Sequence, residues 1–307
     1  MIVKEAKLSL FCFISPTILP VLSLITPHFR LDLLHIDVYS IIWLIYLTNI
    51  VFMNLIVFVL FSGYLYQVAV RATFLGSVFT GGLLVAFLLP NPWIPYGWYM
   101  CVMAFFHYSE FLTIALTNPR TLTIDSFILN HSNEYMIAAV SSWVEFFIEA
   151  YFFPELKTLR LVSYVGLSLC IGGECLRKCA MWTARTNFNH VVQSVRHNDH
   201  QLVTHGIYSV CRHPSYVGWF YWSMGTQMIL VNPLCFVAYI LASWKFFHDR
   251  IMVEEITLIN FFGEQYLDYQ KKVSTGLPFI RGTRRVTQQL GTVEDQGEML
   301  SRVPQVS

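Results

Sequence analysis

Two polar clusters border the last pair of apolar segments, and they hold the residues whose types could support chemistry. The first covers residues 187–219 and contains five of the ten histidines. The second covers residues 244–272 and contains Arg250, Glu254 and Glu255. Because polar side chains beside lipid are costly unless they face a cavity or one another, we expect a functional site at these clusters.

The histidines raise the question of a metal centre. The five in the first cluster are His190, His197, His200, His205 and His213. Membrane hydroxylases and desaturases bind iron through HxxxH and HxxHH patterns, and neither occurs here. An iron or zinc site therefore stays the less favoured alternative to interfacial hydrogen-bonding or pH-sensitive histidines.

The cysteines favour neither a disulfide framework nor a zinc ribbon. None of the seven forms a CxxC pair, and most lie inside apolar runs. Cys175 and Cys179 are one helical turn apart, but no second pair stands nearby. We predict no metal site, because small thiols also pack well inside helices.

Arg250 and Glu254 are four residues apart, which places them on one face of a helix. Two interpretations are open. A surface ion pair at this spacing stabilises a helix by about 0.3–0.5 kcal/mol. A fixed cation and anion in a partly dry pocket would instead each await a ligand group of opposite charge. The spacing alone favours the surface pair.

The composition indicates that membrane-spanning helices position these clusters. Hydrophobic residues make up 55% of the 307 residues and charged residues only 13%, with a mean hydropathy of +0.52. A soluble domain could not bury this much apolar surface. The net charge of +1 gives no global attraction to nucleic acid, so no nucleic-acid partner is expected.

Eight apolar runs are candidates for membrane spans, which need roughly 20 residues each. They cover about 8–26, 38–62, 71–90, 97–117, 134–153, 159–183, 214–231 and 233–248. The sequence thus predicts an all-α integral membrane protein with about eight transmembrane helices and a cytosolic C-terminal cofactor-binding region. The first run, despite a resemblance to a signal peptide, is expected to be a retained span.

The basic residues predict the orientation. All but three of the 20 Lys and Arg residues fall on one side of this layout, the exceptions being Arg30, Lys157 and Arg160. Because basic residues favour the cytosolic side, both termini are expected in the cytosol.

We expect three regions along the chain. Spans one to six, in 1–183, serve as scaffold and substrate access. Residues 184–280 form the catalytic region, with a cytosolic connector, a helical hairpin over 214–248 that turns at Asn232-Pro233, and C-terminal helices. Residues 281–307 form a mobile polar tail.

Small residues inside the spans indicate close helix packing. Ser77 and Gly81 form a small-xxx-small pair, and Gly166, Gly172 and Gly173 interrupt the sixth span. We expect all five to lie at helix contacts.

Both clusters resemble one family. The runs LVTHGIYSVCRHPSYVGWFYWSMGTQ (202–227) and FFHDRIMVEEITLINFFGEQYLDYQKKVSTGLPFI (246–280) closely resemble the isoprenylcysteine carboxyl methyltransferases. The stretch NFNHVVQ (187–193) and the eight-span layout fit the animal branch. RHPSY, the preceding LVTHGIY and the later EE pair together make the resemblance specific.

The resemblance implies methyl transfer from S-adenosylmethionine, yielding S-adenosylhomocysteine, to the C-terminal carboxylate of a farnesylated or geranylgeranylated cysteine. It implies that Arg250 anchors the substrate carboxylate. It also implies residues that contact the cofactor, which are Gln193, His200, Leu202, Val203, Tyr208, His213, Pro214, Ser215, Tyr216 and Glu254. The expected partners are prenylated CaaX-type proteins such as small GTPases, together with membrane lipid, and the expected location is the endoplasmic reticulum membrane.

Plainer readings of the same residues stay open at this point. Pro214 is also typical of a helix start, Tyr208 and Tyr216 of an interfacial aromatic belt, and Gln193 of a solvated surface. A membrane NADPH-dependent sterol or steroid reductase shares an RHP-type C-terminal pattern and is the rival enzyme. A non-catalytic polytopic protein is the rival from another class.

Overall fold

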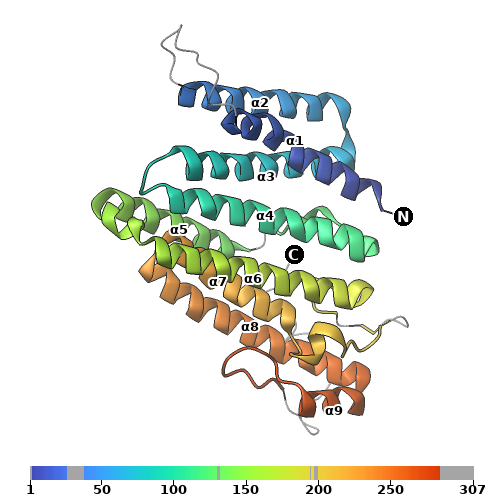
Figure 1. Cartoon of the computed structure of the whole chain (residues 1–307). Coiled ribbons are helices and arrows are strands. Elements are labelled where there is room, and N and C mark those ends of the chain that lie inside the picture. The colour runs from blue at the N-terminus through green and yellow to red at the C-terminus, as the bar shows by residue number, and fades with distance from the viewer. Residues whose placement is uncertain (1, 26–37, 130–131, 194, 197–199, 284–307) are drawn as a thin grey trace. The chain divides into compact units, whose positions relative to one another are not determined.

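The computed structural model describes residues 2–25, 38–129, 132–193, 195–196 and 200–283. Every regular element in these ranges is helical (Figure 1). The nine α-helices are α1 (Lys4–Ile25), α2 (Val38–Leu60), α3 (Gly63–Leu88), α4 (Ile94–Thr117), α5 (Asn133–Phe152), α6 (Arg160–Ala184), α7 (Pro214–Leu230), α8 (Pro233–Phe262) and α9 (Glu264–Lys272). Five short 3-10 helices join them, at Pro119–Thr121, Ile124–Phe127, Pro154–Thr158, Arg185–Asn187 and Gly206–Ser209.

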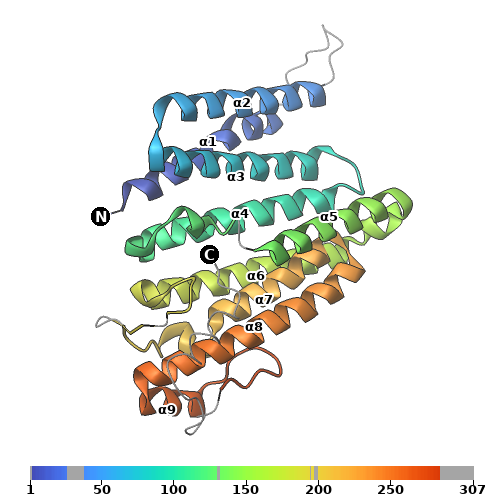
Figure 2. The ribbon, with the colours of Figure 1, turned by 180° about the vertical axis from the view of Figure 1, so that it is seen from behind.

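The chain divides into two compact units. The first comprises Met1–Leu129, Phe146–Ser163 and Ile229–Val231, and the second comprises Asn130–Glu145, Tyr164–Met228 and Asn232–Ser307. Helices α1 to α4 belong to the first unit. The second contains most of α6 and α7, all of α8 and α9, and the connector between α6 and α7 (Figure 2).

In the described part of the chain, four helices are long and apolar enough to cross a membrane. Their spans are Lys4–Ser23, Tyr39–Leu60, Gly63–Leu88 and Ile94–Thr117. Each of the other four predicted segments also contains a helix, so the all-helical prediction is confirmed for the described residues. Those helices are shorter or less apolar than the first four. Helix α7 has only 17 residues, and α5, α6 and α8 each carry several charged residues.

Two helices extend well beyond the membrane spans predicted for them. The third span was expected from residue 71, but α3 begins at Gly63, whose φ of +58° permits a tight turn directly after α2. The eighth was expected to end at 248, but α8 continues unbroken to Phe262. Charges from Lys245 onward mark a change of surroundings and not the end of the helix.

The first unit packs through small residues. Helix α3 contacts α1 and α4, and Ala69 and Ala72 of α3 lie fully buried in the core. A Cβ atom added at Gly76 would lie 2.2 Å from the carbonyl oxygen of Phe13. Backbones therefore approach where side chains are minimal, as is typical of helices packed within membranes.

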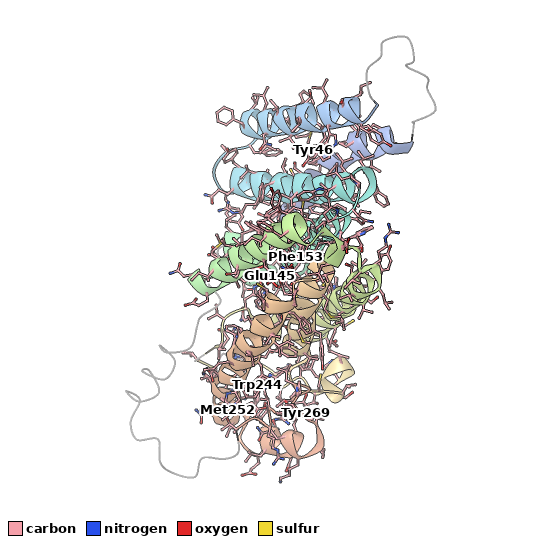
Figure 3. All side chains as sticks on the ribbon, turned by 90° about the vertical axis from the view of Figure 1, so that its left-hand side faces the viewer. Tyr46, Glu145, Phe153, Trp244, Met252 and Tyr269 are labelled. Atoms are coloured by element: carbon pink, nitrogen blue, oxygen red, sulfur yellow. The ribbon has the colours of Figure 1, made fainter. Side chains whose placement is uncertain are left out.

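The small-xxx-small prediction at Ser77 and Gly81 is confirmed. The hydroxyl of Tyr46 on α2 donates a hydrogen bond to the Ser77 carbonyl at 2.9 Å. A Cβ at Gly81 would lie 2.5 Å from the same hydroxyl. These positions of α3 thus receive the aromatic side chain of Tyr46, which Figure 3 labels.

The glycines of α6 divide into two kinds. Gly173 faces α7, since a Cβ there would lie 2.4 Å from the Gly218 carbonyl oxygen, and the Gly166 carbonyl closely approaches Gly225. Gly172 faces open space, with nothing within 4 Å of an added Cβ. Close packing was therefore the wrong explanation for Gly172, which is exposed on α6.

This difference predicts opposite effects of the same substitution. Gly173→Ala is expected to destabilise the protein by about 1–3 kcal/mol, because a backbone carbonyl cannot yield to the new methyl group. Gly172→Ala is the matched control and should be neutral or stabilise by about 0.4–1 kcal/mol, since alanine favours the helix. Thermal unfolding of the two purified variants in detergent measures both. Equal melting temperatures would contradict the assigned contact.

The predicted hairpin between α7 and α8 is present. The side-chain nitrogen of Asn232, at the turn, donates to the Ser142 carbonyl of α5 at 2.9 Å. The Glu145 carboxylate, also on α5 (Figure 3), accepts hydrogen bonds from the backbone N–H groups of Leu234 and Cys235 at 2.8 and 2.7 Å. A carboxylate at this position satisfies the first N–H groups of α8 and complements its dipole.

Candidate active site

One cavity in the second unit, of about 860 Å³ when the space open to solvent is included, collects most of the predicted site residues. Connector residues 202–203, the start of α7 and the far half of α8 contribute to its walls. The predicted residues that line it are Leu202, Val203, Tyr208, His213, Pro214, Ser215, Tyr216, Arg250 and Glu254.

Gln193 and His200 lie outside this cavity. They line a neighbouring cavity of about 560 Å³, again including the space open to solvent, whose wall also includes Tyr216 and Glu254. Since both cavities share these two residues, the predicted set forms two adjoining compartments and not one.

A buried chain of hydrogen bonds joins α7 to α8. The Nε atom of Arg250 donates to the Tyr216 hydroxyl at 2.9 Å. That hydroxyl donates to the Glu254 carboxylate at 2.5 Å, and Nη2 of Arg250 donates to the His190 carbonyl. Arg250 is only 2% exposed. The surface-pair interpretation of Arg250 and Glu254 is therefore wrong: the cation is buried, and Tyr216 stands between the two charges.

The two adjacent glutamates have different surroundings. The Glu254 side chain keeps 29% of its exposure and borders the cavity, whereas the Glu255 side chain is fully buried. Glu255 accepts hydrogen bonds from Arg212 Nε at 2.8 Å and from His213 Nε2 at 3.1 Å. Glu255 therefore holds Arg212 and His213 of the RHP motif (residues 212–214) in place, while Glu254 is available to a ligand.

These contacts set the protonation of Glu255. Burial alone would raise the pKa of its carboxyl, but His213 and Arg212 outweigh burial and hold the pKa below its ordinary value of 4.5. A depressed folded-state pKa contributes stability above the unfolded pKa, and this stability is lost as the pH falls toward the folded value.

Glu255→Gln should therefore lower the melting temperature at neutral pH, because it leaves the buried Arg212 charge without its counter-ion. The deficit relative to the parent protein is expected to shrink as the pH falls from 4.5 toward the lower pKa of the folded state, below which the parent carboxylate is also neutral. Melting curves of both proteins between neutral and acidic pH test this. A deficit that stays constant across the range would exclude the ionic role.

Sequence reasoning missed Arg177 of α6. Its side chain is 2% exposed and lines the main cavity. Nη1 donates to the Ser215 hydroxyl at 2.7 Å, and the guanidinium lies 4.6 Å from the Trp219 ring centroid. The sequence did contain a signal for Arg177, because a cation inside a predicted apolar span is a candidate functional residue. The cavity wall therefore carries the guanidinium groups of Arg177 and Arg250 and the carboxylate of Glu254.

Tyr208 is a neutral donor in this wall. Burial, and then the nearby Glu254 charge, raise the pKa of its phenol. The hydroxyl of Tyr269, on α9, donates to the Tyr208 carbonyl and holds the connector against the C-terminal helix.

Within the described residues, no three His, Cys, Asp or Glu side chains are grouped so that they could hold a metal ion. His197, from the histidine cluster, lies outside those residues. Cys175 and Cys179 are both exposed on α6.

The helical body defines a polytopic membrane protein, and the charged cavity is its candidate ligand site. Comparisons with known proteins specify the family. The isoprenylcysteine carboxyl methyltransferase family matches residues 165–260. Protein-S-isoprenylcysteine O-methyltransferase of Xenopus laevis is 58% identical over 232 residues, which cover 76% of this chain and 80% of that one. The enzyme of the same name from Tribolium castaneum is 55% identical over 247 residues, covering 77% and 88%.

A solved structure agrees with these relatives. It is described as the eukaryotic intramembrane Ras methyltransferase, an isoprenylcysteine carboxyl methyltransferase. The two structures superpose with a TM-score of 0.84 and share 48% sequence identity. The superposed region covers 92% of this chain and 99% of the solved one. The chain belongs to the isoprenylcysteine carboxyl methyltransferase family.

Proposed function

We propose that this protein transfers a methyl group from S-adenosylmethionine to the C-terminal α-carboxylate of a farnesylated or geranylgeranylated cysteine. The supporting observation is the hydrogen-bonded series Arg250, Tyr216 and Glu254 along the cavity wall. It offers a fixed cation for the substrate carboxylate and a fixed anion for the cofactor's ammonium group. The relatives' names favour this reaction over the reductase and the non-catalytic alternative.

Arg250 orients the nucleophile. A carboxylate is already ionised at neutral pH, and the cofactor supplies a methyl group activated by its sulfonium, so no general base is required. The guanidinium is held by Tyr216 and the His190 carbonyl before substrate arrives. Such preorganisation directs one carboxylate oxygen at the methyl carbon without reorganisation during the reaction.

The residues of the two compartments suit the cofactor. Glu254 pairs with its ammonium, Tyr208 can stack or donate a hydrogen bond, and Tyr216, whose hydroxyl proton goes to Glu254, can stack. Backbone groups of Leu202 and Val203 can read the adenine edge. The remaining assigned contacts are Gln193, His200, His213, Pro214 and Ser215. Because Tyr216 and Glu254 border both cavities, we assign the cofactor to the two compartments together.

The lipid part of the substrate explains the membrane body. Transferring a prenyl chain from lipid to water costs about 0.8 kcal/mol per CH₂, so the chain should enter laterally from the bilayer. We propose eight spans with both termini in the cytosol of the endoplasmic reticulum membrane. Residues 1–183 then provide scaffold and access, 184–280 catalysis, and 281–307 a polar tail, although the start of this tail is packed against the catalytic region, because Thr283 is buried and bonded to Glu255.

The partners follow from the reaction. They are prenylated CaaX-type proteins such as small GTPases, and the solved relative is itself described as a Ras methyltransferase. Membrane lipid is the second partner.

A farnesylated peptide that ends in cysteine tests the proposal. Purified protein in lipid nanodiscs, given S-adenosylmethionine, should produce one methyl ester at the peptide's α-carboxylate, which fragmentation mass spectrometry localises. An unchanged peptide, or a methyl group at another atom, would refute the activity.

A further inference from the structure

The loop Gly276–Ile280 presents an unusual aromatic side chain. Phe279 is 94% exposed, the highest value for a large apolar side chain in the described part of the chain. Its neighbours Leu277 and Ile280 are each only 5% exposed. The loop is therefore anchored through two apolar side chains and directs the third away from the protein.

The backbone holds Phe279 in this outward position. Its φ of +63° lies in the left-handed region, which a bulky residue rarely adopts. The hydroxyl of Thr275 donates to the Ile280 carbonyl at 2.5 Å and closes the loop. Gly276 lets the loop approach the protein closely, since a Cβ there would lie 2.7 Å from Cys211 Cβ. A strained residue persists only where its surroundings impose it, so the exposure of Phe279 is built into the loop.

A hydrogen bond places the loop beside α8. The indole nitrogen of Trp244 donates to the Pro278 carbonyl at 2.9 Å. Before Trp244, the outer face of α8 is apolar, with Leu234, Val237 and Leu241 exposed by 76, 55 and 66%. Directly after it comes Lys245, whose side chain is 73% exposed.

Trp244 thus lies at the boundary between the apolar and the charged part of the α8 surface. Tryptophan at such a boundary is typical of the membrane–water interface. Figure 3 shows Trp244 on α8, with Met252 farther along the helix and Tyr269 on α9. The loop that carries Phe279 is tied to the helix at this level.

We propose that Phe279 inserts into the headgroup region of the cytosolic leaflet and fixes the loop to the membrane surface. The inference rests on the proposed topology, in which α8 leaves the bilayer near Trp244. A lipid surface is the occupant because the loop continues the apolar outer face of α8 and no described side chain covers Phe279.

The anchored loop is also joined to the cavity wall. The backbone N–H groups of Arg212 and His213 donate to the carbonyls of Ser274 and Thr275 at 2.8 and 3.2 Å. Membrane attachment at Phe279 therefore steadies the strap, residues 273–283, that supports the RHP motif.

Fluorescence quenching in lipid nanodiscs tests the insertion. Cys175 and Cys179 are exposed and are replaced by serine, while the other five cysteines are buried. A nitrobenzoxadiazole dye is attached to Phe279→Cys and, as a matched control, to Lys272→Cys on exposed α9. At 279, lipids spin-labelled near the headgroup should quench the dye several-fold more than at 272, and aqueous iodide several-fold less. Equal quenching at both positions would overturn the proposal.

A second measurement examines the native side chain. In nanodiscs, Phe279→Asp should speed amide hydrogen exchange in 274–281 several-fold relative to the parent protein, because the loop loses its attachment. Unchanged exchange would also overturn the proposal. Neither readout involves turnover, so failure of the insertion and failure of the methyl-transfer proposal are separate results.

Discussion

Replacing Arg250 by lysine is expected to slow methyl transfer by roughly 100-fold, about 2.7 kcal/mol of transition-state stabilisation. Lysine keeps the positive charge but loses the planar fork that can hold both carboxylate oxygens. It also loses the Nε donor that contacts Tyr216 at 2.9 Å. The effect should appear in kcat as well as in kcat/KM, because orientation matters most in the transition state.

The matched control for this substitution is Arg281→Lys, at an exposed position in the strap. Its turnover and melting temperature should equal those of the parent protein. Near-normal turnover of Arg250→Lys would show that charge alone suffices, and the orientation role would have to be abandoned.

Replacing Glu254 by glutamine is expected to weaken cofactor binding by about 30-fold, or about 2 kcal/mol, the contribution of a charged hydrogen bond. Glutamine keeps an oxygen that can accept from Tyr216 but removes the charge that pairs with the ammonium group. The KM for S-adenosylmethionine should rise, while kcat changes less. Calorimetric titration with S-adenosylhomocysteine measures the affinity directly.

Glu264→Gln, on the exposed first turn of α9, is the matched control and should bind the cofactor normally. An unchanged affinity in Glu254→Gln would remove Glu254 from the cofactor site. A large fall in kcat with unchanged affinity would instead place it nearer the reacting atoms.

The helices could be predicted from the sequence because backbone groups in lipid must be satisfied within each segment. Each predicted span contains a helix, and the errors fall at ends. The eighth span was expected to end at 248 because Lys245 and the charges after it indicate an exit from lipid, while the helix itself was expected to carry Arg250 and Glu254 beyond that point. The helix continues because buried Ile251 and Val253 still pack against the protein.

The grouping of the site follows from the α7–α8 hairpin. Tyr216 and Arg250 are 34 residues apart, yet an antiparallel pair brings the start of one helix beside the far half of the other. Residue types and the family resemblance could identify these positions. The intervening Tyr216 hydroxyl could not be foreseen, because helical periodicity says nothing about what stands between Arg250 and Glu254.

The buried ion pair of Arg212 with Glu255 was also beyond the reach of local patterns. The two residues are 43 positions apart, and the pairing depends on α8 passing behind the RHP motif. Spacing alone does not indicate which of the two adjacent glutamates faces the cavity; only the family resemblance implied Glu254. Burial separates them: Glu255 is enclosed, and Glu254 borders the cavity.

For Pro214, the helix-start interpretation and the site interpretation are compatible. It is the first residue of α7, as the helix-start reading predicted, and it also lines the cavity. Proline favours the first turn of a helix, and that turn is here part of the wall.

The most direct test is transfer of labelled methyl from S-adenosylmethionine to N-acetyl-S-farnesylcysteine by the purified protein in lipid. Arg250→Ala and Glu254→Ala are measured in parallel. We predict turnover by the parent protein, almost none with Arg250→Ala, and a raised KM for the cofactor with Glu254→Ala. Absence of turnover in the parent protein, together with binding of NADPH, would contradict the account.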